Sequence, residues 1–282
     1  MFSNIKIGVY SFFIVLLFMP IGHALMVLTE LILHQHKYIG AGLIGLIGVF
    51  LLAAGIRKTK KDTIATLYGF LAGIFVWTGW IEFSFVWVAE KLQIPGLTEH
   101  GEVTTKPEYL LMPSSIGLLG SFFLLNLFTH NRCQFFNWFQ HNFKIKGVIK
   151  LANPNLKPLA IITFVETIMV LWTFYIVLLL VYDPEIAGDR HPITYITAFG
   201  SLFWSIYLFS NLIKIQVFDY ALRYAIPTVI IFWNFVEVMG RWNLIEEIWI
   251  SPVNHKLELT LISAILIAFI TYYILENKKI AS

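Results

Sequence analysis

The sequence GVYSFFIVLLFMPIGHALMVLTELIL, residues 8–33, decides the fold of this chain. His23 and Glu30 are its only histidine and charged residues. A helix of roughly 20 apolar residues is long enough to cross the hydrocarbon core of a bilayer. The segment therefore predicts a transmembrane helix that carries two polar side chains.

Seven further apolar stretches follow the first, and all are long enough to span a bilayer. The 282 residues are 58% hydrophobic and 13% charged, about half the charged fraction that is usual in soluble domains. The single cysteine excludes a disulfide scaffold, and 16% aromatic residues exclude a disordered chain. We therefore predict an all-α integral membrane protein, one domain over residues 1–282. The eight predicted spans are 8–33, 39–56, 63–89, 109–129, 158–182, 193–213, 221–240 and 258–275.

The distribution of charge predicts the orientation of the spans. With the N-terminus in the cytoplasm, fourteen of the 20 Lys and Arg residues fall in inside segments. Ten acidic residues, including Glu90, Glu108 and Asp189, fall outside or at the outer boundary. We therefore expect a multi-pass protein of the plasma or inner membrane with both termini in the cytoplasm. The excess of basic over acidic residues therefore reflects the membrane topology. No sequence pattern supports a nucleic-acid partner.

Residues 131–150 predict an amphipathic helix on the cytoplasmic leaflet. Phe135, Trp138, Phe139 and Phe143 recur at helical spacing, and basic residues surround them. Such a helix would contact anionic lipid through its lysines. The alternative is a loop whose aromatic side chains pack under the bundle.

The two halves of the chain share sparse sequence marks that suggest a 4+4 tandem duplication. Four helices per repeat would give both halves the same orientation, related by an axis along the membrane normal. Coincidence is the alternative, because Met, Val, Leu and Trp are common here. The marks are Asp62, Tyr68, Glu82 and Trp87 against Asp219, Tyr224, Glu237 and Trp242; His23 against Glu166; and Lys106, Glu108 and Leu111 against Lys256, Glu258 and Leu261.

Span one carries the densest group of candidate site residues. His23, Glu30 and His34 share one helical face, with Glu30 and His34 one turn apart. A carboxylate and an imidazole at that spacing can relay a proton or bind one metal ion. The alternative for Glu30 and His34 is simple hydration at the end of the helix.

Glu82 and Glu237 are further intramembrane carboxylates, a residue type that usually faces the bundle interior or water. Glu82 should be partly desolvated, which suits proton exchange. Arg241 lies four residues after Glu237, so a structural ion pair competes with a functional reading. The secondary candidates are Glu166, Asn234 and Arg241. A separate pattern, Ala65, Gly69 and Gly73, predicts a small-residue face for close helix packing.

We expect His23 and Glu82 to converge on a polar cavity open to the outside, with Glu30 and Glu237 nearby. This site favours a secondary transporter or a proton- or cation-coupled carrier. A membrane-embedded oxidoreductase with a divalent or transition metal on the His/Glu residues is the first alternative. A non-catalytic subunit that contacts other membrane subunits is the second. The sequence does not identify the substrate.

Overall fold

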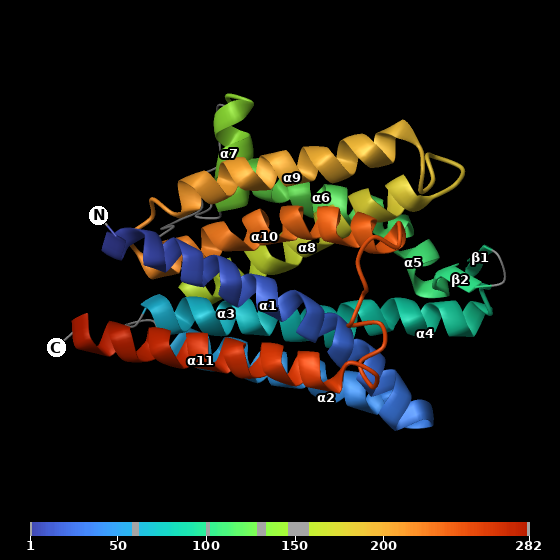
Figure 1. Ribbon diagram of the computed structural model, residues 1–282, viewed down its shortest axis with the longest axis horizontal. Coiled ribbons are helices and arrows are strands. Elements are labelled where there is room, and N and C mark those ends of the chain that lie inside the picture. Colours follow the sequence, from blue (N-terminus) through green and yellow to red (C-terminus); the bar gives the residue numbers. More distant parts are fainter. Residues whose placement is uncertain (1, 58–61, 100–101, 129–133, 146–157, 281–282) are drawn as a thin grey trace.

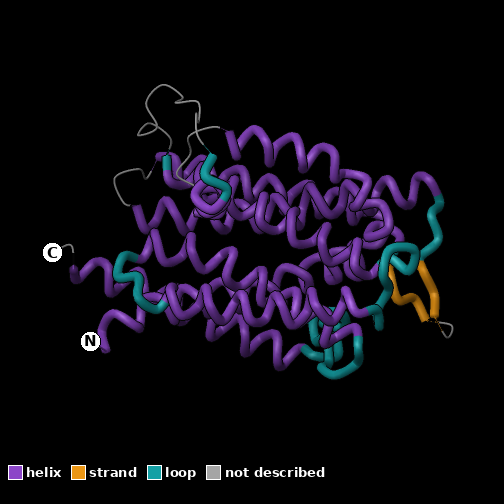
Figure 2. Tube along the Cα trace, turned by 90° about the horizontal axis from the view of Figure 1, so that it is seen from above, coloured by secondary structure: helices purple, strands orange, loops and turns teal. Residues whose placement is uncertain are grey.

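The computed structural model describes residues 2–57, 62–99, 102–128, 134–145 and 158–280, which form an almost entirely helical bundle. The long helices lie side by side along one axis (Figures 1 and 2). A π-turn, Trp77–Glu82, joins α3 to α4 without a break in the helix. The helices are α1 Phe2–Leu33, α2 Lys37–Arg57, α3 Asp62–Val76, α4 Phe83–Leu92, α5 Pro107–Leu111, α6 Ile116–Phe128, α7 Gln134–Asn142, α8 Leu159–Tyr182, α9 Pro192–Leu212, α10 Phe218–Arg241 and α11 Lys256–Ile280.

Six helical stretches of the described chain are long and apolar enough to cross a membrane. One of them, Lys6–Arg57, is 52 residues long and contains both α1 and α2. A short 3₁₀ turn, His34–His36, separates these two helices, and α2 then packs back against α1. The α11 helix is outside the six. The prediction of an all-helical fold built from long apolar helices is therefore confirmed.

Four helices form the centre of the bundle, namely α1, α3, α8 and α10, and their contacts follow a repeated scheme. The α2 helix packs along α3, as α9 packs along α10. The α8 helix packs along α3, as α1 packs along α10. Outside these pairs, α11 contacts α1, as α6 contacts α8.

The predicted small-residue face of α3 is confirmed. Ala65, Gly69 and Gly73 are all buried. A Cβ atom at Gly69 would overlap the backbone of Ala160 on α8, and one at Gly73 would lie 2.7 Å from the Cβ of Thr167. The absence of side chains at these two glycines therefore sets how closely α3 and α8 approach.

The two ends of the bundle carry different connections. The chain termini lie at one end, together with α7 (Figure 1). The opposite end carries the α8–α9 loop and a two-stranded antiparallel hairpin, β1 Leu97–Glu99 and β2 Glu102–Thr105. This hairpin was not predicted from the sequence.

The α7 helix covers part of the predicted amphipathic segment and runs across the direction of the long helices (Figure 1). Phe135 and Phe136 are buried in the core, whereas Trp138 is 40% exposed and Phe143 is 67% exposed. Lys144 is exposed at the end of the segment. Residues 131–133 and 146–150 of the prediction, with Lys146 and Lys150, lie outside the described residues.

Candidate functional site

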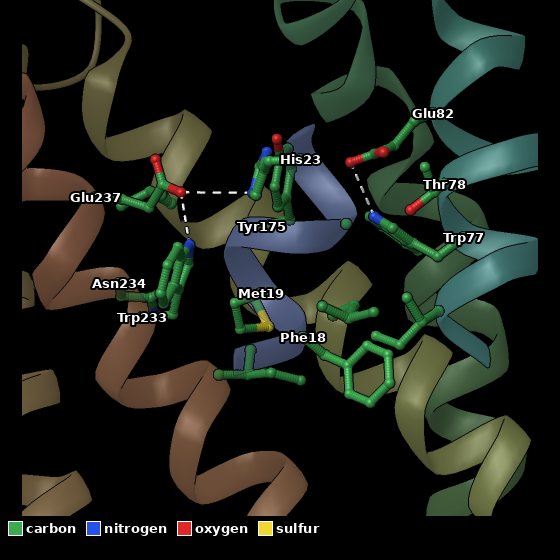
Figure 3. A pocket seen from close by; sticks show the side chains of 15 residues that line it. Phe18, Met19, His23, Trp77, Thr78, Glu82, Tyr175, Trp233, Asn234 and Glu237 are labelled. Atoms are coloured by element: carbon green, nitrogen blue, oxygen red, sulfur yellow. Dashed lines mark hydrogen bonds and ion pairs between the residues drawn. The ribbon is translucent and has the colours of Figure 1, made fainter. Parts of the chain in front are cut away.

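A cavity lies where the four central helices meet, in the half of the bundle nearer the β-hairpin. It offers about 40 Å³ to the centres of water molecules, room for roughly three waters. Each central helix contributes side chains to its wall, and Figure 3 shows the arrangement. The lining residues are Phe18, Met19, Gly22 and His23 of α1; Ile74, Trp77, Thr78 and Glu82 of α3 and the π-turn; Leu171, Tyr175 and Leu178 of α8; and Ile230, Trp233, Asn234 and Glu237 of α10.

Glu237 connects two helices on one side of the cavity. Its Oε1 accepts a hydrogen bond of 2.6 Å from Trp233 Nε1, one turn earlier on α10. The same oxygen lies 3.5 Å from His23 Nε2 on α1. The His23 and Glu237 side chains are 16% and 17% exposed, so both retain some surface toward the cavity. The imidazole and the carboxylate therefore form an ion pair when His23 is protonated.

Glu82 lies on the other side of the cavity, across the His23–Tyr175 pair from Glu237 (Figure 3). It is 3% exposed, and its Oε1 accepts a hydrogen bond of 3.0 Å from Trp77 Nε1. Residues five apart on a regular α-helix point about 140° away from each other. The π-turn winds in one extra residue, which brings the Trp77 and Glu82 side chains to the same side. The indole–carboxylate pair of α10 is thereby repeated with a spacing of five instead of four.

Tyr175 completes the arrangement and was not among the residues predicted from the sequence. Its ring is stacked with the imidazole of His23 at a centroid distance of 6.4 Å. It also meets Trp77 at 5.9 Å, much as His23 meets Trp233 at 6.5 Å. A tyrosine in an aromatic-rich apolar span gives no sequence signal of its own, because tyrosines also serve as packing side chains.

Two aromatic side chains from outside the four central helices contact the cavity residues. Trp249, from the loop between α10 and α11, is 7% exposed and contacts the rings of His23 and Trp233. Tyr109 of α5 contacts Tyr175 at 5.8 Å. The polar groups of the cavity are therefore shielded on both sides by an aromatic ring.

Asn234 is a further polar group in the wall. Its side chain is 4% exposed, and its Nδ2 has no hydrogen-bond partner among the described residues. Buried amide groups are rarely left without a partner, because their desolvation is costly. A ligand or water in the cavity is the natural partner for this group.

Glu30 and His34 lie outside the cavity that contains His23. Glu30 is 3.8 Å from Lys37 Nζ and 3.4 Å from Lys106 Nζ, and it lines a second, more open cavity. His34 is exposed in the 3₁₀ turn, with a positive φ of 40°. His34 therefore fits the alternative of simple hydration at the end of the helix. Glu30 does not, because it lies close to the ammonium groups of Lys37 and Lys106.

The structure does not assemble the predicted metal site. No group of three His, Cys, Asp or Glu residues suited to a metal ion exists within the described ranges. Only His23 and Glu237 of the five primary candidates form a direct pair. A single imidazole with one nearby carboxylate falls short of the three protein ligands that catalytic zinc sites use.

The structure also places two of the secondary candidates. An ion pair between Arg241 and Glu237 was the alternative to a functional role, and Arg241 Nε instead donates a hydrogen bond of 2.7 Å to Asp189 in the α8–α9 loop. Its guanidinium also lies 4.5 Å from the ring centre of Tyr182. Glu166 is fully buried on α8 and does not line the cavity. Asp189 is therefore the carboxylate that Arg241 pairs with here, and Glu237 contacts His23 and Trp233.

Glu247 follows α10 in the loop that carries Trp249, and its side chain packs over Gly240. Burial raises the pKa of Glu247 from 4.5 to about 7; the Glu237 carboxylate raises it further and Arg241 opposes the shift. The folded protein thus favours the protonated acid. Its stability should fall as pH rises through this window and stay low above about pH 7.

Replacing Glu247 by Gln should therefore stabilise the protein at pH 8 and have little effect at pH 4.5. We expect roughly 1 kcal/mol at pH 8, because solvent around this half-buried group screens part of the penalty. The apparent unfolding midpoint in detergent at the two pH values measures it. Glu185→Gln, an exposed carboxylate in the α8–α9 loop, is the control. Equal effects of both substitutions at pH 8 would contradict the explanation by burial.

No protein-family model, curated protein or solved structure matches this chain. The site must therefore be interpreted from its own geometry.

Proposed function

We propose that this chain is an eight-span membrane protein that couples proton movement to the passage of a small solute. The count of eight spans follows from the six long apolar stretches and two further features. The Lys6–Arg57 stretch folds back on itself and supplies two spans, and α11 supplies the eighth. Large apolar side chains on the outer helices are exposed, as lipid contact requires. Examples are Phe50 of α2, Phe203 of α9 and Ile267 of α11.

The orientation follows from the charges at the two ends of the bundle. The end with the β-hairpin also carries Asp183, Asp189, Glu246 and Glu247 in its loops. Arg57 and Lys214 lie at the end with the termini, and by sequence fourteen of the 20 Lys and Arg residues belong to the segments expected on that side. The positive-inside rule therefore supports a cytoplasmic location of that end in a cell membrane. In this orientation α7 lies along the inner membrane surface, where anionic lipids would face Lys144.

The repeated packing scheme supports a tandem duplication of four helices. Matching α1 to α8, α2 to α9 and α3 to α10 maps one set of contacts onto the other. In this match His23 corresponds to Tyr175, not to Glu166 as the sequence marks suggested, because each ring contacts the tryptophan one turn before a carboxylate. The extra residue of the π-turn accounts for the unequal Trp-to-Glu spacings. The cavity then lies on the axis that relates the halves.

One observation carries the functional proposal: each half contributes a carboxylate with little exposure, Glu82 or Glu237, to a single cavity between the halves. Buried carboxylates exchange protons when water or solute reaches them. Sites at the interface of repeated halves change access when one half moves against the other. The apolar core on the cytoplasmic side, including Phe18, Phe70 and Ile226, closes the cavity from that direction.

Purified protein in liposomes loaded with a pH-sensitive dye tests the proposal. Solutes grouped by charge class are added outside, and solute-driven proton flux is recorded. We expect at least one class to drive flux above that of empty liposomes. The double variant Glu82→Gln with Glu237→Gln should abolish this flux. A flux that the double variant retains, or no flux with any class, would overturn the proposal.

A further inference from the structure

The cavity wall holds two carboxylates and a single imidazole. Glu82 and Glu237 line it, His23 lies 3.5 Å from Glu237, and none of the lining residues is Lys or Arg. Each carboxylate uses Oε1 to accept its indole hydrogen bond. A buried carboxylate needs a positive partner or a proton. A positively charged ligand would supply the former.

Aromatic rings form much of the remaining wall. Trp233 and Tyr175 are both nearly parallel to the imidazole between them, at interplanar angles of 19° and 23°. The tryptophan N–H groups of the wall point at the carboxylates (Figure 3). Each carboxylate therefore meets the edge of an indole ring and leaves the electron-rich ring faces free of a carboxylate. Aromatic faces beside carboxylates favour organic ammonium ions, which bind by cation–π attraction.

The same wall disfavours a hydrated or metallic cation. Calcium and magnesium require about six oxygen ligands in close array. Here the two carboxylates lie on opposite sides of the His23–Tyr175 pair (Figure 3). The Nδ2 group of Asn234 is a donor without a partner among the described residues, and a water molecule in the cavity, not the cation, can accept from it.

We infer that the cavity binds a small organic ammonium ion between Glu82 and Glu237. Its volume, about 40 Å³ for water centres, fits a ligand of roughly two to five heavy atoms. The inference rests on the proposed function and specifies its solute as an amine cation, from methylammonium to tetramethylammonium. The ligand nitrogen contacts one carboxylate, and its methyl or methylene groups lie on the rings of Trp233 and Tyr175.

Isothermal titration calorimetry of the full chain in lipid nanodiscs tests this binding. The probes are tetramethylammonium chloride, methylammonium chloride, sodium chloride and the neutral analogue tert-butanol. We expect at least one ammonium ion to bind tenfold or more tightly than tert-butanol and sodium. Trp233→Leu should weaken that binding at least tenfold, whereas Trp233→Phe, which keeps an aromatic face, should weaken it by only a few fold. Trp87→Leu, at a tryptophan that is 53% exposed on α4, is the matched control and should bind as the parent does.

Equal binding of tert-butanol and the ammonium ions, or binding unchanged in Trp233→Leu, would overturn the inference. If Trp233→Leu fails to fold, Glu237→Gln, which preserves side-chain shape, replaces it and should also weaken binding tenfold. The flux assay separates this inference from the proposed function. Ammonium binding without flux contradicts the carrier proposal alone, and proton-coupled flux of another solute without ammonium binding contradicts this inference alone.

Discussion

Replacement of Glu82 by Gln is expected to abolish solute-driven proton flux while the protein remains folded. Glutamine keeps the shape of the side chain and an oxygen that can accept the Trp77 indole hydrogen bond. It cannot release or take up a proton, however, so the coupling step is lost. We expect at least a hundredfold reduction of flux, because a missing proton-transfer group typically costs two to four powers of ten.

Glu90→Gln is the matched control for this experiment. Glu90 belongs to the same continuous helix as Glu82, but its side chain is 54% exposed and pairs with Lys37. It should leave flux within about twofold of the parent. The unfolding midpoint of both variants should remain close to that of the parent. Flux in Glu82→Gln above half the parental rate would show that Glu82 is a packing residue.

Gly69→Val should produce the largest loss of stability among the substitutions considered. The first side-chain carbon would overlap the backbone of Ala160, and backbone atoms cannot move aside as a flexible side chain can. The α3 and α8 helices must therefore separate, and contacts along both would be lost. Overpacking of this kind costs about 1–3 kcal/mol, and the added bulk of valine places the change at the upper end.

Thermal unfolding in detergent, followed by circular dichroism, measures this effect. Gly42→Val is the control, because no atom lies within 4 Å of a Cβ at that position on α2. Both substitutions place the same β-branched residue within a helix, so their difference isolates the contact. Equal midpoints for the two variants would show that α3 and α8 do not depend on close approach at Gly69.

The long helices could be predicted from sequence because apolar length alone determines them. The π-turn could not, since Trp77–Glu82 reads as ordinary helix and nothing in its composition marks the extra residue. Among the site residues, His23, Glu82 and Glu237 were identifiable as polar groups in apolar spans. Tyr175 was not, because a tyrosine is also a normal packing residue.

The pairings were harder to predict than the residues. Arg241 and Glu237 are neighbours on one helix, so local spacing favoured an ion pair between them. The observed partner, Asp189, is 52 residues away and reaches Arg241 only after α8, α9 and α10 have packed. Likewise, Glu30 and His34 share a helix face with His23, but Lys37 and Lys106 hold Glu30 near the end of the bundle. Helical periodicity predicts which residues share a face, whereas tertiary packing decides what that face meets.

The π-turn also changes the direction in which side chains point along one continuous span, so that the parts before and after it face different neighbours. Before it, Gly69 and Gly73 direct α3 toward α8; after it, Glu90 directs α4 toward Lys37 and Tyr38. Deleting one residue from the turn would rotate everything beyond it by about 100°. Glu82 would leave the cavity and Glu90 would lose its partners in the same step. The extra residue of the turn therefore allows one helix to pack its α3 part against α8 and to direct its α4 part toward Lys37 and Tyr38. A regular helix could not make both sets of contacts.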